Sequence, residues 1–299
     1  MSADLETRPH RAATSPRRPW RRGRLRGGSG RPGFLTYGLL TALLVSSVYP
    51  LWWSTVIASR SNAALGLDWP PLFPGGNFWT NVGRVFDTIP FWLALGNSIL
   101  ISSIITVSVV TFSTLAGFSF AKLKFKGRDG LMVSVVVTMA IPTQLGIIPL
   151  FMLMRTLGWT GEIGAVIIPT LVTAFGVFFM RQYLVTAIPD ELLEASRVDG
   201  ASMILTFWHV ALPAARPAMA ILGLFTFMMA WTDFLWPLLV LDADNPTLQT
   251  ALSQLQSAHF VDYSIVLTGA VMATIPLLVL FVLAGKQLIS GIMQGAVKG

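Results

Sequence analysis

The chain has 299 residues, of which 54% are hydrophobic, 12% are charged and none is cysteine. Soluble domains carry about twice that charged fraction, so this composition argues against a soluble globular protein. The lack of cysteine excludes disulfides, thiolate metal sites and cysteine nucleophiles. The net charge of +7 is concentrated near the N-terminus, so it does not indicate a basic protein surface as a whole.

The first 32 residues form a basic leader that contains RPHRAATSPRRPWRRGRLRGGSGR. Its composition is typical of a disordered segment. We expect it to lie in the cytoplasm, to fix the topology and to contact anionic lipid. A nucleic-acid-binding arm is disfavoured, so no nucleic-acid partner is expected. A twin-arginine export signal is equally disfavoured, because the following apolar run is too long and lacks a small-residue cleavage site.

Six apolar segments follow the leader, and each meets or approaches the roughly 20 residues that a helix needs to cross a bilayer. They cover about 34–58, 91–117, 131–154, 163–182, 217–241 and 263–284. The sequence therefore predicts an all-α, polytopic membrane protein with six transmembrane helices in one domain over residues 33–285. A short tail over 286–299 completes the chain, and a short interfacial helix is expected at 77–86.

Several of these segments contain proline, including positions 142, 149, 169, 237 and 276. Each proline removes a backbone donor and is expected to kink its helix. Kinked helices suit a protein that opens and closes a pathway, although static membrane proteins contain them too.

The distribution of basic residues predicts the orientation. If both termini are cytoplasmic, only Arg60, Arg84 and Arg155 of the 21 Lys and Arg residues lie outside. The positive-inside rule therefore favours a multi-pass protein of the bacterial cell membrane with its N-terminus and C-terminus in the cytoplasm.

The polar stretch IPDELLEASRVDGASMILTFWHVALP, residues 188–213, interrupts this apolar chain within a cytoplasmic loop over 184–216. Pro189 is expected in the first turn of a helix, followed by two acids that complement the helix dipole. The helix is predicted to run to Asp199 and to end at Gly200 in the left-handed conformation.

A second short helix is predicted after Ser202, which can cap it. Met203, Phe207 and Val210 would share one face of that helix, and Pro213 with Pro217 would mark the turn into the next span.

This helix–glycine–helix pair has the features of a docking element. Ala195 is small enough to allow close approach of a partner, and Glu194 is placed to meet a basic group on it. The alternative is an amphipathic helix that only lies in the membrane interface.

Asp233 is the single acid within a predicted span, in the sequence AWTDFLWPL. An intramembrane carboxylate costs about 2.5–3.5 kcal/mol on insertion scales, so a functional role is the starting hypothesis. Beside Trp231 and Trp236 it could bind a sugar, which has polar edges and apolar ring faces. Alternatively, it is a capped or hydrated carboxylate near the end of a tilted helix.

Several kinds of chemistry have no support in the sequence. No segment matches the phosphate-binding pattern G-x-x-x-x-G-K-[ST], the three histidines lie in different segments, and no intramembrane pair of carboxylates is present. No catalytic residue, metal site or bound cofactor is therefore expected on this chain.

The segment Glu194–Ala201, followed by Leu212 and Pro213, resembles the EAA loop of ABC importer permeases, which reads E-A-A, three residues, G, and later I-x-L-P. Ser196 replaces the second alanine, a change between small residues. NSILIS at 97–102, AKLKFKGRDGL at 121–131 and MAWTDFLWPLLVL at 229–241 resemble the carbohydrate permeases of the maltose-type family, and more closely the six-span subunit than its longer companion.

The resemblance implies a permease subunit of a binding-protein-dependent ABC importer for sugars, with an oligosaccharide as the expected solute. It implies four kinds of partner: a second permease, two cytoplasmic ATPase subunits that carry ATP and Mg, an extracytoplasmic sugar-binding protein and the lipid bilayer. The chain itself would not be an enzyme, because ATP hydrolysis belongs to the partner subunit.

The site residues follow from the same resemblance. The expected ATPase-docking residues are Glu191, Glu194, Ala195, Ser196, Asp199, Gly200, Ala201, Leu212 and Pro213. The candidate residues of the translocation pathway are Asn97, Gln144, Trp231, Asp233 and Trp236. The alternatives are an ion-coupled secondary carrier and an ABC permease for a non-sugar solute.

Overall fold

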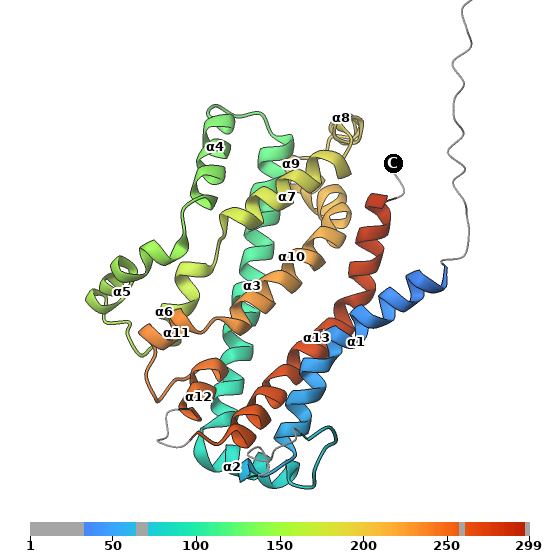
Figure 1. Ribbon diagram of the computed structural model, residues 1–299. Helices are drawn as coiled ribbons and strands as arrows, with labels where there is room; N and C mark the ends of the chain where they lie inside the picture. The colour runs from blue at the N-terminus through green and yellow to red at the C-terminus, as the bar shows by residue number, and fades with distance from the viewer. Residues whose placement is uncertain (1–32, 64–70, 257–260, 297–299) are drawn as a thin grey trace, which may run out of the picture. The chain divides into compact units, whose positions relative to one another are not determined.

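A computed structural model of the protein describes residues 33–63, 71–256 and 261–296, and these residues form helices without any β-strand (Figure 1). The chain divides into two units, Met1–Val48 and Tyr49–Gly299. Helix α1 (Phe34–Ala58) begins in the first unit and matches the first predicted span. The predicted leader lies outside the described residues.

The second unit contains every other element. In chain order they are α2 (Phe78–Thr88), α3 (Phe91–Lys122), α4 (Arg128–Met139), η2 (Thr143–Gly146), α5 (Ile147–Thr156), α6 (Ile163–Ile167), η3 (Ile168–Thr170), α7 (Ala174–Ala187), α8 (Asp190–Val198), α9 (Met203–Thr206), the π-helical η4 (Phe207–Ala211), α10 (Leu212–Thr232), α11 (Leu235–Val240), α12 (Leu248–Gln254) and α13 (Tyr263–Ala296). The short helix expected at 77–86 is α2, and α13 continues into the predicted tail.

Five helical segments among the described residues are long and apolar enough to cross a membrane, and a bent pair of helices can make a sixth. The five are α1, α3, the α6–α7 segment Ile163–Ala187, the α9–α10 segment Met203–Thr232, and Tyr263–Leu283 of α13. The fold is that of an all-α, polytopic membrane protein.

The third predicted span, 131–154, is not one helix. Helix α4 ends at Met139, and the chain bends by 89° before the helical segment Thr143–Thr156 begins. Pro142 has an extended ψ of 123° at this bend. The cause is local, because proline removes a backbone donor and disfavours helical geometry in the residue before it.

The fifth predicted span, 217–241, has different boundaries in the structure. Its helix begins earlier, because α9, η4 and α10 run together from Met203 to Thr232. It also ends earlier, since Asp233 is extended, with ψ 124°, and only the short α11 follows. The expected turn at Pro213 and Pro217 is wrong: the helix continues through both prolines.

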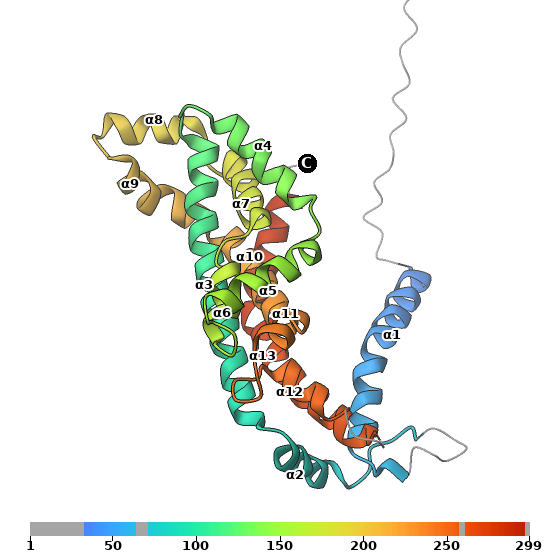
Figure 2. The same ribbon diagram turned by 90° about the vertical axis from the view of Figure 1, so that its left-hand side faces the viewer.

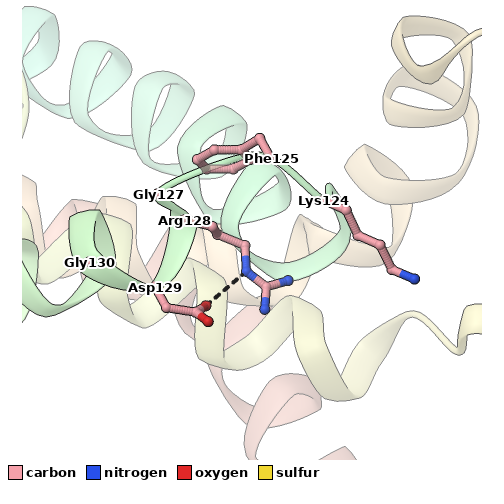
Figure 3. Close-up of a pocket in the computed structure, with 6 residues that line it drawn as sticks. All are labelled: Lys124, Phe125, Gly127, Arg128, Asp129 and Gly130. Atoms are coloured by element: carbon pink, nitrogen blue, oxygen red, sulfur yellow. Dashed lines mark hydrogen bonds and ion pairs between the residues drawn. The ribbon is translucent and has the colours of Figure 1, made fainter.

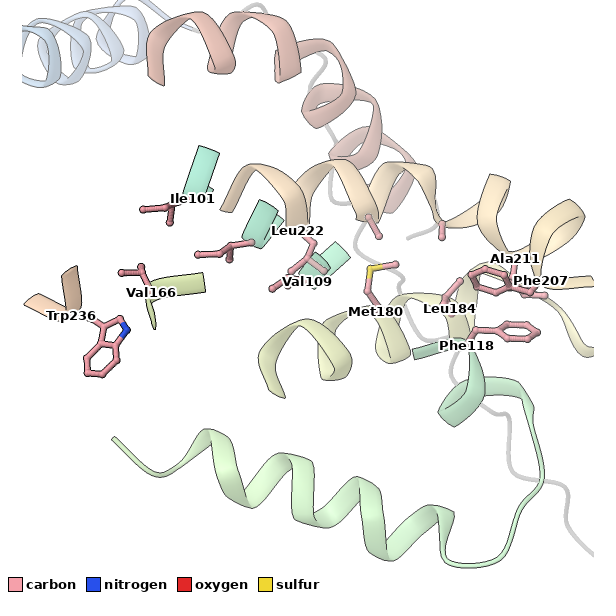
Figure 4. Packing of buried hydrophobic residues seen from close by; sticks show 14 of the residues in the cluster. Ile101, Val109, Phe118, Val166, Met180, Leu184, Phe207, Ala211, Leu222 and Trp236 are labelled. Atoms are coloured by element: carbon pink, nitrogen blue, oxygen red, sulfur yellow. The ribbon is translucent and has the colours of Figure 1, made fainter. Parts of the chain in front are cut away.

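The main core lies where α3 packs against α7 and α10 (Figure 4). Phe118, Met180, Leu184 and Leu222 are among its buried side chains. Gly117 allows α3 to approach α7 closely, since a Cβ atom there would lie 2.7 Å from the Cβ of Met180. Small residues at helix contacts are the usual way that membrane helices pack closely.

A second core joins α2, the start of α3, the end of α10, α12 and α13. It lies at the end of α3 opposite to α8 and α9 (Figure 2). Arg84 of α2 also pairs with Asp262, just before α13, at 2.7 Å. The unit therefore has two separately packed ends, and α8 belongs to only one of them.

Candidate functional site

Helix α8 (Asp190–Val198) begins just after Pro189, which was expected in its first turn, and ends one residue before the predicted Asp199. Pro189 precedes it with an extended backbone, and Asp190 and Glu191 occupy its first turn, where they complement the helix dipole. The helix ends at Val198, and Gly200 has a φ of 78°. The prediction of a left-handed Gly200 is thus confirmed.

Two backbone hydrogen bonds close the end of α8. The N–H of Ala201 donates to the carbonyl of Ser196 at 2.9 Å, and the N–H of Gly200 donates to that of Arg197 at 3.0 Å. This pair of bonds is the Schellman motif, which satisfies the last carbonyl groups of a helix. The turn after α8 is therefore fixed by the backbone and does not depend on a bound partner.

The second helix begins as predicted. The hydroxyl of Ser202 accepts a hydrogen bond from the N–H of Leu205 at 3.3 Å. Phe207 is buried, and Met203 and Val210 are partly buried, so these three residues lie on the inner face of this helix. The π-helical η4 then precedes Pro213, and the N–H of Leu212 reaches the carbonyl of Phe207. A π-helical turn adds a residue to the helix locally, which explains why the chain can pass Pro213 without a turn.

Three contacts hold α8 on the rest of the unit. Leu193 is its buried residue and belongs to the main core. The Ser196 hydroxyl lies 3.1 Å from that of Thr206, which is itself buried. The ammonium of Lys122, the last residue of α3, pairs with the carboxylate of Asp190 at 2.7 Å. Helix α8 is thus attached at both ends and in its middle.

The remaining surface of α8 is free. Glu191, Glu194, Ala195, Asp199 and Gly200 are exposed, as the docking hypothesis requires. Large apolar side chains accompany them, and the most exposed are Val198 (87%), Ile204 (73%) and Trp208 (57%). We call this combination of acidic and apolar side chains on α8, α9 and η4 the α8 surface.

The structure separates the predicted docking residues into two groups. Ser196 and Ala201 are partly buried and shape the turn after α8. Leu212 and Pro213 lie at the start of α10, beyond η4, with Leu212 partly buried and Pro213 exposed. Leu212 packs against the main core, so these two positions contribute to the α9–α10 helix and not to α8.

Three of the candidate pathway residues are buried and make structural hydrogen bonds. The Asn97 amide donates to the carbonyl of Pro246 at 3.0 Å. The indole N–H of Trp231 donates to Ala273 at 3.3 Å, and that of Trp236 donates to the carbonyl of residue 165 at 3.1 Å. Trp231 and Trp236 belong to different cores.

The two other candidates are more accessible. Gln144 is exposed in η2, next to the bend of the third span. Asp233 is partly buried in the break between α10 and α11, and its carboxyl group lies beside the backbone N–H groups that begin α11. This placement agrees with the alternative in which Asp233 is a capped carboxylate near the end of a helix. The structure does not bring the five candidates together, and their pathway role stays a prediction.

Sequence reasoning missed the contacts that hold α8. Lys122 and Thr206 were not recognised as its partners. A neighbouring contact was missed too: the rings of Phe118 of α3 and Phe207 of η4 have centroids 5.5 Å apart. The sequence carries one signal for Lys122: it is the first cation after a long apolar segment, where a helix terminus favours positive charge.

A pocket of about 380 Å³ lies in the turn between α3 and α4 (Figure 3). Lys124, Phe125, Arg128 and Asp129 line it together with two glycines, and Arg128 pairs with Asp129 at 3.0 Å. Over the described part of the chain, no three His, Cys, Asp or Glu side chains gather as they would around a metal ion.

Comparison with known proteins identifies the family of this chain. Residues 110–288 match the family described as "Binding-protein-dependent transport system inner membrane component". The chain is 36% identical over 210 residues to the arabinooligosaccharides transport system permease protein of Halalkalibacterium halodurans, covering 70% of this chain and 75% of that protein. It is 30% identical over 268 residues to the lactose transport system permease protein of Rhizobium radiobacter, covering 89% and 97%.

Two further comparisons widen this picture. The sn-glycerol-3-phosphate transport system permease protein of Yersinia enterocolitica is 29% identical over 216 residues, covering 70% of this chain and 76% of that protein. A chain in the crystal structure of a bacterial ABC transporter involved in the import of the acidic polysaccharide alginate has the same fold. Its TM-score is 0.72 at 24% identity, over 84% of this chain and 94% of that chain. The protein therefore belongs to the binding-protein-dependent transport system inner membrane components, the permease subunits of ABC importers.

Proposed function

We propose that this chain forms half of the translocation pathway of an ATP-driven sugar importer and that α8 docks it to a separate ATPase subunit. The observation that carries the proposal is α8 itself. Its end is closed by its own backbone, Leu193 anchors it in the core, and its acidic and apolar side chains remain exposed. A helix that is fixed but uncovered fits a docking element.

The chemistry of the α8 surface suggests what the partner presents. Exposed Val198, Ile204 and Trp208 suit an apolar groove, and Glu194 suits a basic group at its edge. Interfaces commonly combine an apolar centre with charged groups at the rim. Ala195, with its short side chain, allows the groove to approach the backbone of α8.

The proposal includes a set of partners that act together. A second permease completes the pathway, two cytoplasmic ATPase subunits bind ATP and Mg, and an extracytoplasmic binding protein delivers the solute. Differential affinity of the ATPases for two conformations of the permease pair would supply the driving force, as any population shift requires. The excess of Lys and Arg in the predicted inner segments supports an orientation with both termini in the cytoplasm.

The proposed solute is a sugar, and an oligosaccharide in particular. The names of the arabinooligosaccharide and lactose permeases support this choice. A non-sugar solute is the second candidate, because the glycerol phosphate permease is almost as similar. Membership of the family argues against the ion-coupled secondary carrier.

Affinity purification tests the docking role. The tagged chain is co-expressed with its companion permease and ATPase and is purified in mild detergent. We expect both partners to co-purify, and we expect Glu194→Lys to lose the ATPase while keeping the companion permease. Asp129→Lys, the same charge reversal in the first turn of α4, is the matched control and should keep both partners. Retention of the ATPase by Glu194→Lys would contradict the proposed docking contact.

Uptake of candidate solutes tests the proposed substrate class. The complex with its binding protein is reconstituted in liposomes that contain ATP, and uptake of labelled arabino-oligosaccharides, lactose and glycerol phosphate is compared. Uptake restricted to the sugars supports the proposal. Uptake of glycerol phosphate alone would contradict a sugar substrate and would favour the second candidate, a non-sugar solute.

A further inference from the structure

Lys122 occupies an unusual position for a charged residue. It is the last residue of α3, and only 6% of its side chain is exposed. Its ammonium donates to the carboxylate of Asp190 at 2.7 Å and lies 3.5 Å from the carbonyl of Val185. Among the ion pairs in the described part of the chain, this is the one that involves α8.

The two partners have opposite environments. The side chain of Asp190 is 80% exposed, whereas that of Lys122 is almost fully covered. A pair of exposed charges contributes little to stability, because water screens the attraction. A covered ammonium without an acceptor is costly, because charged groups lose their hydration on burial. The position of Lys122 therefore depends on Asp190 much more than the reverse.

The two ends of α8 contact two different spans. At its C-terminal end, Ser196 contacts Thr206, which continues through η4 into α10. At its N-terminal end, Asp190 contacts Lys122 of α3. Helix α8 thus bridges two membrane-spanning helices, and each end has its own polar contact.

We propose that Lys122 is a positioning residue that fixes α8 to α3, so that a displacement of α8 moves α3 together with α10. This inference rests on the proposed docking role of α8. Without the pair, α8 would still be joined to α7 through Ile188 and Pro189 and held by Leu193 and Ser196, but it would lose its direct polar contact with α3.

The ratio of solute transported to ATP hydrolysed is the property that tests this role. The complete complex with its binding protein is reconstituted in liposomes, and both rates are measured for Lys122→Met and Asp190→Asn. We expect the ATPase subunits to remain bound and active, while the transport ratio falls about fivefold or more. Lys126→Met, which removes an exposed cation from the same turn, should keep the wild-type ratio.

The absence of native cysteine allows a rescue experiment. Lys122→Cys and Asp190→Cys are combined in one chain and joined by a short bifunctional thiol reagent. The unlinked double variant should have the low ratio, and the linked one should recover at least half of the wild-type ratio. A linked variant that stays as poor as the unlinked one would overturn the proposal, because α8 and α3 would not need to move together.

The experiments distinguish a failure of this inference from a failure of the docking proposal. If the wild-type complex does not retain an ATPase, the docking role fails. If the ATPase is retained and both Lys122→Met and Asp190→Asn transport with the wild-type ratio, only the role of Lys122 fails. Asp190→Asn changes an exposed side chain, so it answers the question even if Lys122→Met does not fold.

Discussion

At the scale of single residues, Gly200 shows how far a local signal can be trusted. Its φ of 78° is the conformation that a glycine after a helix was expected to adopt. A Cβ atom at this position would meet nothing within 4 Å. The requirement for glycine therefore comes from the backbone conformation alone and not from crowding.

Gly200→Val should destabilise the turn by about 1–3 kcal/mol, because a β-branched residue disfavours a positive φ. Thermal unfolding of the detergent-solubilised protein, followed by tryptophan fluorescence, measures the loss. Gly200→Asn is the control and should cost much less, since asparagine tolerates this conformation. Equal losses for the two variants would indicate that φ is not the cause.

Asp262 carries a second residue-scale prediction. One of its carboxylate oxygens accepts hydrogen bonds from the N–H and the hydroxyl of Ser264, and the other pairs with Arg84. Burial raises the pKa of Asp262, but the hydrogen bonds from Ser264 and Arg84 outweigh it and hold that pKa below its usual range. The hydrogen bond from the N–H of Ser264 makes Asp262 the cap of α13. Asp262→Ala should therefore destabilise the protein by about 1 kcal/mol.

The lowered pKa gives this effect a pH dependence. A carboxylate with a depressed pKa stabilises the fold above its unfolded pKa of about 3.9, and this stabilisation is lost as the pH falls through the folded pKa. The difference in melting temperature between wild type and Asp262→Ala should therefore be constant from pH 7 to about pH 5 and should shrink only below about pH 4. A difference that already vanishes between pH 6 and 5 would contradict the role of this carboxylate.

At the scale of elements, the sequence predicts helices well and their ends less well. The first span, α2 and the start of the polar segment at Asp190 agree with expectation because length, proline and capping residues mark them. The break at Asp233 was missed, since the apolar composition continues unchanged into α11. The continuation through Pro213 was missed because a π-helical turn leaves no pattern in the sequence.

The bend in the third span yields an element-scale prediction. Pro142→Ala restores a backbone donor at the bend, and α4 and α5 should then lie closer to one axis. Spin labels at Leu131→Cys and Met152→Cys, both exposed positions in a chain without native cysteine, report the distance between the two helices. The distance should increase in Pro142→Ala. An unchanged distance would mean that packing, and not Pro142, sets the bend of 89°.

At the scale of the whole molecule, composition and charge were the most informative features. They predicted an all-α, multi-pass membrane protein, which agrees with the structure. The family of the chain is that of permease subunits, which are not themselves enzymes. The contacts of α8 could not be predicted, because Lys122 and Asp190 are distant in sequence and meet only in the folded chain. The pathway residues could not be assigned either, since the sequence does not tell a tryptophan that packs from one that binds.

The orientation of the whole molecule is testable with single cysteines. Lys126→Cys lies in a predicted inner turn and Phe73→Cys in a predicted outer segment, and both positions are exposed. A membrane-impermeant maleimide added to intact spheroplasts should label Phe73→Cys and should reach Lys126→Cys only after permeabilisation, as the positive-inside rule requires. The opposite pattern would reverse the proposed topology.

ATP-dependent uptake by the reconstituted complex tests the central claim most directly. The chain, its companion permease and the ATPase are placed in liposomes with ATP inside, and a binding protein loaded with labelled oligosaccharide is added outside. We predict uptake that requires both internal ATP and the binding protein and that is lost in Glu194→Lys. Uptake that proceeds without ATP, driven by an ion gradient, would contradict the account of this protein as an ATPase-coupled permease.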